Sequence, residues 1–215
     1  MSSSGSICSC DSVAACAPST ETESMLMNAD ILRQTFDQGM HYDEFVASGD
    51  PMHQPQWHQR FEQLGLDEAQ RELISGFQRT TNVLCLTGTW CGDCALQGAA
   101  LQRIAEAAEG RINLRFVLRG DRFAELVVAN QINQGYRVPV TWFMAEDFQP
   151  CSRIGDRSLS RYRSMARKAL GDASPVLADP PADPVRAVLQ EMIDEFERVE
   201  LMLRLSPRLR ELHGD

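Results

Sequence analysis

The residues in this sequence best suited to chemistry are Cys91 and Cys94, in the run Trp90-Cys91-Gly92-Asp93-Cys94. Two residues separate the two cysteines, with an apolar run before them and a helical pattern after them. This spacing places both sulfur atoms on the first turn of a helix, close enough to form a disulfide. Free backbone N–H groups and the helix dipole favour a thiolate at the first cysteine. A thiolate with a second thiol beside it predicts disulfide exchange.

The other interpretations of this pair are a structural disulfide and half of a zinc site. A zinc site needs a second CxxC or CxxH pair, and the sequence has neither. Cys8, Cys10 and Cys16 do not have a recognised zinc spacing and have no histidine nearby. We therefore expect redox chemistry and no metal.

Composition and charge narrow the class of protein. The chain has 215 residues, of which 43% are hydrophobic, so it can bury the core of one domain with extensions. Its net charge of -9 argues against nucleic acid and anionic membranes as main partners. No apolar run reaches the roughly 18 residues of a transmembrane helix. Seven cysteines in such a chain do not indicate a secreted disulfide framework, so we expect a cytoplasmic location.

The first segment, residues 1–24, is rich in Ser, Thr, Ala and Cys and is predicted to be a disordered leader. Val13-Ala14-Ala15-Cys16 has the form of a lipoprotein cleavage box. However, residues 1–17 contain no Lys or Arg and lack the apolar region of a signal peptide. We therefore expect no export.

The elements that must position the cysteines begin with residues 25–79, a predicted N-terminal helical extension. From residue 80 to 170 the pattern alternates between strands and helices. We predict strands over 83–86, 112–118, 140–144 and 151–154, and helices over 93–108, 121–132 and 158–170. This order predicts an α/β domain whose mixed sheet has helices on both faces, with parallel pairing first and antiparallel pairing at the far end.

The C-terminal part has two segments. Residues 171–182 contain three prolines and are predicted to form a linker. Residues 183–215 are predicted to form an amphipathic helix that begins at Asp183-Pro184. We expect its apolar side to pack on its own domain. The alternative is an interface with a partner or with a second copy of the chain.

Several positions match a known family. Trp90–Cys94 matches the Trp-Cys-Gly-Pro-Cys run of thioredoxin except at Asp93, and Val138-Pro139 matches its cis-proline. Gly155 matches a glycine that follows the hairpin in that family. With this element order, residues 80–170, about half of the chain, resemble the thioredoxin family. The resemblance implies a three-layer thioredoxin-like fold with helical extensions at both ends.

The resemblance also implies a role for each matched residue. Cys91 corresponds to the nucleophile that attacks a substrate disulfide, and Cys94 to the thiol that resolves the mixed disulfide. Trp90 shapes the surface beside the sulfurs, and Pro139 lies against them with its backbone ready to pair with a substrate strand. The supporting residues implied are Trp90, Gly92, Asp93, Val138 and Pro139.

Two positions depart from the family. Asp93 stands where proline is usual; an acid suits a helix N-terminus, but its charge raises the pKa of a nearby thiol. Cys85, six residues before Cys91, replaces a buried aspartate that helps move the proton of the second cysteine. We hypothesise that Asp93 is the proton acceptor for Cys94 instead.

The remaining candidates have structural interpretations. Arg115 interrupts an apolar strand, which indicates an edge strand with the arginine pointing to solvent; the alternative is a role near the sulfurs. Cys85 and Cys151 are expected to be buried strand thiols. Three of the four histidines precede the α/β domain and are expected at surface or packing positions: His41, His53 and His58.

The sequence therefore predicts a thiol–disulfide oxidoreductase that acts on protein disulfides. It needs no bound cofactor because the electrons reside in two sulfurs, and it depends on an upstream reductase. The main alternative is an adaptor that uses the thioredoxin scaffold and its helical extensions for binding. Such an adaptor would keep its function after loss of both sulfurs.

Overall fold

The computed structural model describes residues 28–171 and 178–215, so the predicted leader and part of the predicted linker lie outside the described residues. Its sheet has the strand order β2-β1-β3-β4. Strand β1 (Thr81–Thr87) is parallel to β2 (Ile112–Leu118) and antiparallel to β3 (Val140–Met144), which in turn is antiparallel to β4 (Pro150–Gly155). The predicted α/β fold with a mixed sheet is confirmed.

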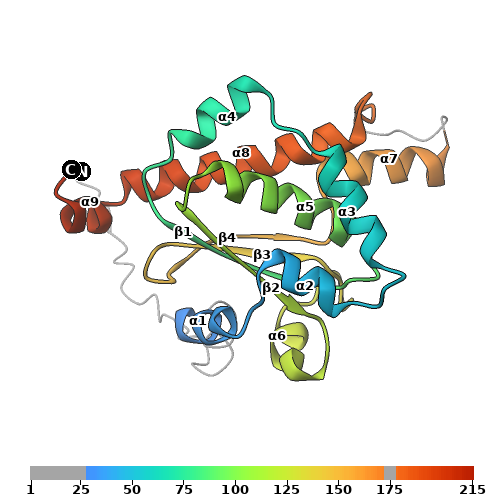
Figure 1. Ribbon diagram of the computed structural model, residues 1–215, viewed down its shortest axis with the longest axis horizontal. Helices are drawn as coiled ribbons and strands as arrows, with labels where there is room; N and C mark the ends of the chain where they lie inside the picture. The colour runs from blue at the N-terminus through green and yellow to red at the C-terminus, as the bar shows by residue number, and fades with distance from the viewer. Residues whose placement is uncertain (1–27, 172–177) are drawn as a thin grey trace, which may run out of the picture.

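Helices cover both faces of the sheet (Figure 1). The N-terminal helices are α1 (Ala29–Asp37), α2 (Tyr42–Ser48), α3 (Gln54–Gln63) and α4 (Glu68–Ser75). Helix α5 (Gly92–Ala107) follows β1, and the short turn η1 (Asp121–Phe123) with α6 (Ala124–Ala129) follows β2. The C-terminal helices are α7 (Leu159–Leu170), α8 (Pro184–Leu205) and α9 (Pro207–His213). Among the helices of the described residues, none is both long and apolar enough to cross a membrane.

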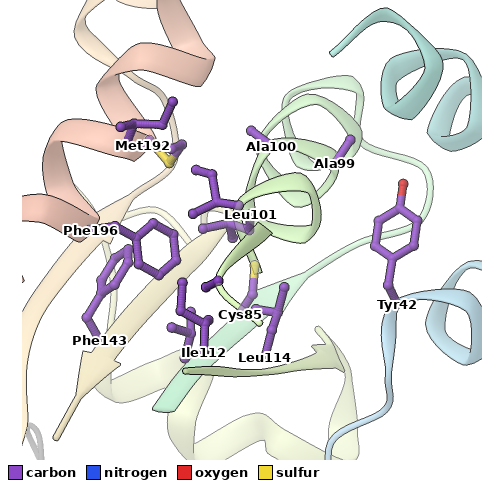
Figure 2. Close-up of a cluster of buried hydrophobic side chains, with 14 of the residues drawn as sticks. Tyr42, Cys85, Ala99, Ala100, Leu101, Ile112, Leu114, Phe143, Met192 and Phe196 are labelled. Atoms are coloured by element: carbon purple, nitrogen blue, oxygen red, sulfur yellow. The ribbon is translucent and has the colours of Figure 1, made fainter. Parts of the chain in front are cut away.

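The larger of two hydrophobic cores lies between the sheet, α5 and α8 (Figures 1 and 2). The apolar side of α8 is buried there, and the rings of Phe196 and Phe143 meet edge to face with their centroids 5.0 Å apart. The expectation that this helix packs on its own domain is confirmed. The N-terminal extension also enters this core, through Tyr42, Phe45 and Trp57.

A smaller core lies on the opposite face of the sheet, under α1 and α6. Neighbouring residues of β1 alternate between the two cores: Cys85 belongs to the larger core, and Leu84 and Leu86 to the smaller. This alternation is the expected consequence of the strand geometry, because successive side chains point to opposite faces. It fixes which residues of β1 face α5.

Helices α3 and α5 pack very closely. The Trp57 side chain of α3 is fully buried, and its Nε1 donates to the Thr89 carbonyl oxygen at 2.9 Å. A Cβ atom at Gly98 of α5 would lie 2.5 Å from the Trp57 ring, closer than any normal contact. The absent side chain at Gly98 thus makes room for the ring that holds the loop before the cysteines.

Two predicted helices end earlier than expected. The helix predicted over 121–132 ends at Ala129, because the Asn130 side chain donates to the Leu126 carbonyl at 2.8 Å and the backbone of Ile132 bridges Gly135. The C-terminal helix is divided in two because Pro207 cannot continue α8, and α9 starts at this proline.

Arg115 lies on the edge strand β2, as predicted, but its side chain is only partly exposed to solvent. The Met40 and Phe116 backbones exchange two hydrogen bonds of 2.9 Å, so the N-terminal segment covers part of this edge. The Arg115 side chain is half-buried; its Nη1 lies 3.2 Å from His41 Nδ1, and its guanidinium lies 5.3 Å from the centre of the Phe36 ring. Arg115 therefore helps attach the N-terminal helices to the sheet.

Candidate active site

Cys91 and Cys94 lie where β1 gives way to α5. Cys91 is the N-cap residue of this helix, with extended backbone angles, and its Sγ accepts a hydrogen bond from the Cys94 backbone N–H at 3.4 Å. Both cysteines are free thiols. The structure thus brings together the two sulfurs that the sequence singled out, at the positive end of a helix dipole.

The environment of Cys91 stabilises its thiolate. The pKa of Cys91 is lowered to about 6, first by the Cys94 thiol, which donates a hydrogen bond to its sulfur. Partial burial opposes this shift, the backbone N–H groups of Cys94 and Asp93 support it, and the negative charge of Asp93 opposes it. Near neutral pH the half-exposed Cys91 is therefore mostly thiolate, the form that attacks disulfides.

The environment of Cys94 is the opposite. Cys94 belongs to the first turn of α5, and its side chain is completely buried. Burial raises the pKa of Cys94 far above its usual value, and the hydrogen bond to Cys91 raises it further. Cys94 is therefore a protonated thiol that stays out of reach of external reagents in the resting state.

The loop before β3 supplies the other wall of the site. The Val138-Pro139 peptide bond is cis, as the resemblance implied. The Cys91 Sγ lies 3.9 Å from the Val138 carbonyl oxygen, within donating distance for a thiol. The loop that contains the predicted residues Val138 and Pro139 therefore lies beside the partly exposed sulfur of Cys91.

Trp90 forms the exposed rim of the site. Its side chain is 44% exposed and folds back over Gly88, where an added Cβ would lie 2.7 Å from the indole. The Arg119 guanidinium carbon lies 5.5 Å from the centre of the Trp90 ring, which is a cation–π contact. An exposed aromatic surface beside a reactive thiolate suits contact with another protein.

Asp93 is bound by two arginines that the sequence analysis did not connect with the site. Its two carboxylate oxygens accept hydrogen bonds from Nε of Arg157 at 2.8 Å and Nε of Arg161 at 2.7 Å. Arg157 also reaches Asp156 at 3.2 Å, and Asp156 pairs with Arg137 at 3.0 Å, next to Val138. This network connects the CxxC turn with the cis-proline loop and the start of α7.

These contacts change what can be expected of Asp93. The Asp93 side chain is only 11% exposed, and both oxygens are engaged by positive charges. Such a pairing partly neutralises the repulsion between the Asp93 carboxylate and the Cys91 thiolate. The geometry favours a structural and electrostatic role for Asp93 over the hypothesised transfer of a proton from Cys94.

The other two described cysteines occupy strands. Cys85 is fully buried in β1, and burial raises its pKa to about 12. Cys151 in β4 is half-buried, so only Cys85 has the full burial expected of both, although burial raises the pKa of Cys151 as well. Neither thiol has the environment that activates Cys91.

Comparisons with known proteins agree with this architecture. A family model described as Thioredoxin matches residues 39–168, more than half of the chain. A crystal structure of a Pseudomonas aeruginosa protein of unknown function aligns with a TM-score of 0.57 and 21% identity, over 76% of this chain and 93% of that one. An HIV epitope scaffold aligns with a TM-score of 0.60 and 18% identity, over 77% of this chain and 97% of that one. No curated protein matches the sequence.

Proposed function

The chain belongs to the thioredoxin family, and we propose that it is a thiol–disulfide oxidoreductase that acts on protein disulfides through Cys91 and Cys94. One observation carries this proposal. Cys91 is half-exposed with a pKa lowered to about 6, and the thiol that lowers it belongs to the buried Cys94. A nucleophilic thiolate with a protected second thiol is the arrangement that reduction of a disulfide in two steps requires.

The reaction follows from these two environments. The Cys91 thiolate attacks one sulfur of a substrate disulfide, so a mixed disulfide forms and the other substrate sulfur leaves with the electron pair as a thiolate. Cys94 then attacks Cys91 Sγ, which forms the Cys91–Cys94 disulfide and releases the second substrate sulfur. Two electrons pass from the protein to the substrate, and a separate dithiol reductase must return them.

The surroundings of Cys91 support a protein substrate. The exposed Trp90 indole directly precedes the thiol in the sequence, and the Val138 carbonyl oxygen lies 3.9 Å from its sulfur. An exposed aromatic side chain offers contact area to a polypeptide, whereas small-molecule sites are usually deep pockets. We place the protein in a reducing compartment, the cytoplasm, because its chemistry requires reduced cysteines.

The proposal is tested by insulin reduction and by trapping. The parent protein, with a chemical reductant, should accelerate insulin reduction, and Cys91→Ser should abolish the effect. Cys94→Ser should instead accumulate a mixed disulfide at Cys91, which identifies substrates by mass spectrometry. If the parent neither reduces insulin nor yields a trapped disulfide in the Cys94→Ser form, the proposal is wrong.

The adaptor alternative gives a different outcome in the same experiments. An adaptor would retain its partners after replacement of both Cys91 and Cys94 and would show no turnover. It assigns binding to the helical extensions at both ends of the chain. Since α2, α3 and α8 pack into the central core, these extensions also have a role within the chain itself.

A further inference from the structure

In the proposed reaction Cys94 must lose a proton. The resemblance to thioredoxin implies a buried aspartate at position 85 as its acceptor, but this chain has a cysteine there. Cys94 must lose its proton to attack the mixed disulfide, yet it is completely buried and its pKa is far above the usual value. The position that holds a buried aspartate in thioredoxin is Cys85, a protonated thiol. The Asp93 carboxylate is engaged by Arg157 and Arg161.

A hydroxyl group lies in the same buried layer. Thr87 is two residues after Cys85 in β1, so both side chains point to the face of the sheet that α5 covers. Figure 2 shows Cys85 on this face, with its sulfur directed toward α5. The Thr87 side chain is completely buried, next to the start of the loop that leads to Cys91.

The Thr87 hydroxyl is free to serve a group that forms during the reaction. Among the residues that the structure describes, it makes no hydrogen bond of normal geometry in the resting state, although it lowers the pKa of two neighbouring thiols, Cys85 and Cys94. A buried hydroxyl without such a bond is unusual, since it carries the full cost of its lost hydration. Thr141, which pairs with Cys85 across β1 and β3, is different because its hydroxyl donates to Cys85 Sγ at 3.4 Å.

We infer that the Thr87 hydroxyl donates a hydrogen bond to the Cys94 thiolate during resolution of the mixed disulfide. This inference rests on the proposed function. The backbone of Gly88 is a second group that favours the thiolate form of the same sulfur. Both groups lower the pKa of Cys94, against the much larger effect of burial. Thr87 contacts a reacting atom and is in this sense catalytic, although it gives up no proton of its own.

The step balances without another reactant. The Cys94 proton ends on the departing substrate sulfur, so the products are the Cys91–Cys94 disulfide and a free substrate thiol. The bond that forms joins Cys94 Sγ to Cys91 Sγ, and the bond that breaks joins Cys91 Sγ to the substrate. The hydrogen bond from Thr87 stabilises the negative charge on Cys94 while this exchange takes place.

The test separates attack from resolution. Fully reduced protein is mixed with one equivalent of a peptide disulfide, quenched with acid at set times, and analysed by intact mass and peptide mapping. The mixed disulfide at Cys91 is then observed to form and to decay. We expect Thr87→Val, which keeps the shape of the side chain, to slow the decay about tenfold or more and so accumulate the intermediate.

Matched variants keep the result interpretable. Thr87→Ser retains a hydroxyl and should restore decay to near the parental rate, whereas Thr141→Val, which removes a hydroxyl in the same layer, should leave decay unchanged. The pH midpoint of Cys91 alkylation should change little in Thr87→Val, which excludes a general disturbance of the site. If Thr87→Val fails to fold, Thr87→Ala is compared with Thr87→Ser in the same way.

The outcomes that oppose the inference are distinct from those that oppose the proposed function. A parent protein that forms no mixed disulfide contradicts the oxidoreductase function itself. A parent that forms and resolves it, with a valine or alanine variant at position 87 that resolves it equally fast, overturns the role of Thr87 alone. The inference is also overturned if Thr141→Val slows the decay as much as Thr87→Val.

Discussion

Cys91 and Cys85 lie six residues apart in the sequence, and their thiols differ in pKa from about 6 to about 12. Cys85 lies inside a strand with apolar neighbours, where burial penalises the charged form. Cys91 is at the first position before a helix, where a thiol and two backbone N–H groups face its sulfur. The reactivity of Cys91 therefore comes from its position between the end of β1 and the start of α5, and not from the cysteine residue as such.

The largest expected difference between these cysteines is in turnover. Cys91→Ser should reduce the rate of insulin reduction to that of the chemical reductant alone, because a serine hydroxyl is not a nucleophile toward disulfides at neutral pH. Cys85→Ala should retain most of the activity, at some cost in stability from the small cavity it creates. Loss of turnover in Cys85→Ala, with the folded state intact, would show instead that Cys85 also takes part in the reaction.

Alkylation directly measures the difference in thiol pKa and accessibility between Cys91 and Cys85. With iodoacetamide and peptide mapping, Cys91 of the reduced protein should label with a midpoint near pH 6, because its pKa is lowered to about 6. Cys85 should stay unlabelled through neutral pH in the folded protein, since burial both shields it and raises its pKa to about 12. Unfolding in urea should make Cys85 label like an ordinary thiol, which serves as the control.

Stability should depend on pH through Cys91. Its pKa is about 6 in the folded protein, below the value of about 8.5 expected in the unfolded chain. Between these values the unfolded state binds more protons, so the stabilisation grows as pH rises and is lost as pH falls through the folded pKa. After allowance for partial exposure, we expect reduced protein to gain about 1–2 kcal/mol between pH 5.5 and 8 relative to Cys91→Ser. Urea unfolding of both proteins under reducing conditions measures this difference, and parallel pH profiles would contradict it.

The smallest expected effect concerns the arginines around Asp93. Arg161→Ala removes one partner of the carboxylate, so the negative charge acts more strongly on Cys91 and the alkylation midpoint should rise by less than ~1 pH unit. Asp93→Asn should lower it by a similar amount, because the repelling charge is gone. Arg163→Ala, a substitution on the same helix, is the control and should leave the midpoint unchanged.

The same Asp93→Asn variant tests the earlier hypothesis of proton transfer. If Asp93 accepted the proton of Cys94, its amide variant would resolve the mixed disulfide slowly while attack by Cys91 stayed fast. The contacts to Arg157 and Arg161 lead us to expect parental resolution instead.

The strands were the most predictable part of the fold. Those over 112–118 and 140–144 have the predicted bounds, because runs of apolar and β-branched residues end at clear turn signals. The helix predicted over 121–132 was too long, since its apolar pattern continues after the Asn130 side chain has capped the backbone. The single helix predicted over residues 183–215 is divided at Pro207, a residue that ends a helix and can begin a new one.

The candidate site was predictable only where it is local in sequence. The CxxC spacing of Cys91 and Cys94 and the Val138-Pro139 pair are short motifs that can be recognised in the sequence itself. Arg157 and Arg161 did not, because they contact Asp93 across 64 and 68 residues of chain and look like ordinary surface charges in a helical segment. The sequence also does not mark Thr87 as a functional residue, because threonine is common at the ends of apolar strands.

The close packing of Trp57 on Gly98 has a consequence for how this sequence can vary. A Cβ at position 98 would lie 2.5 Å from the indole, so any larger residue there requires a smaller one at position 57. Trp57 also donates to Thr89, the residue before Trp90, so shrinking it releases the loop that carries the reactive cysteine. We therefore expect relatives that keep the reactive pair to retain both Trp57 and Gly98, and relatives that have lost the pair to change the two positions together.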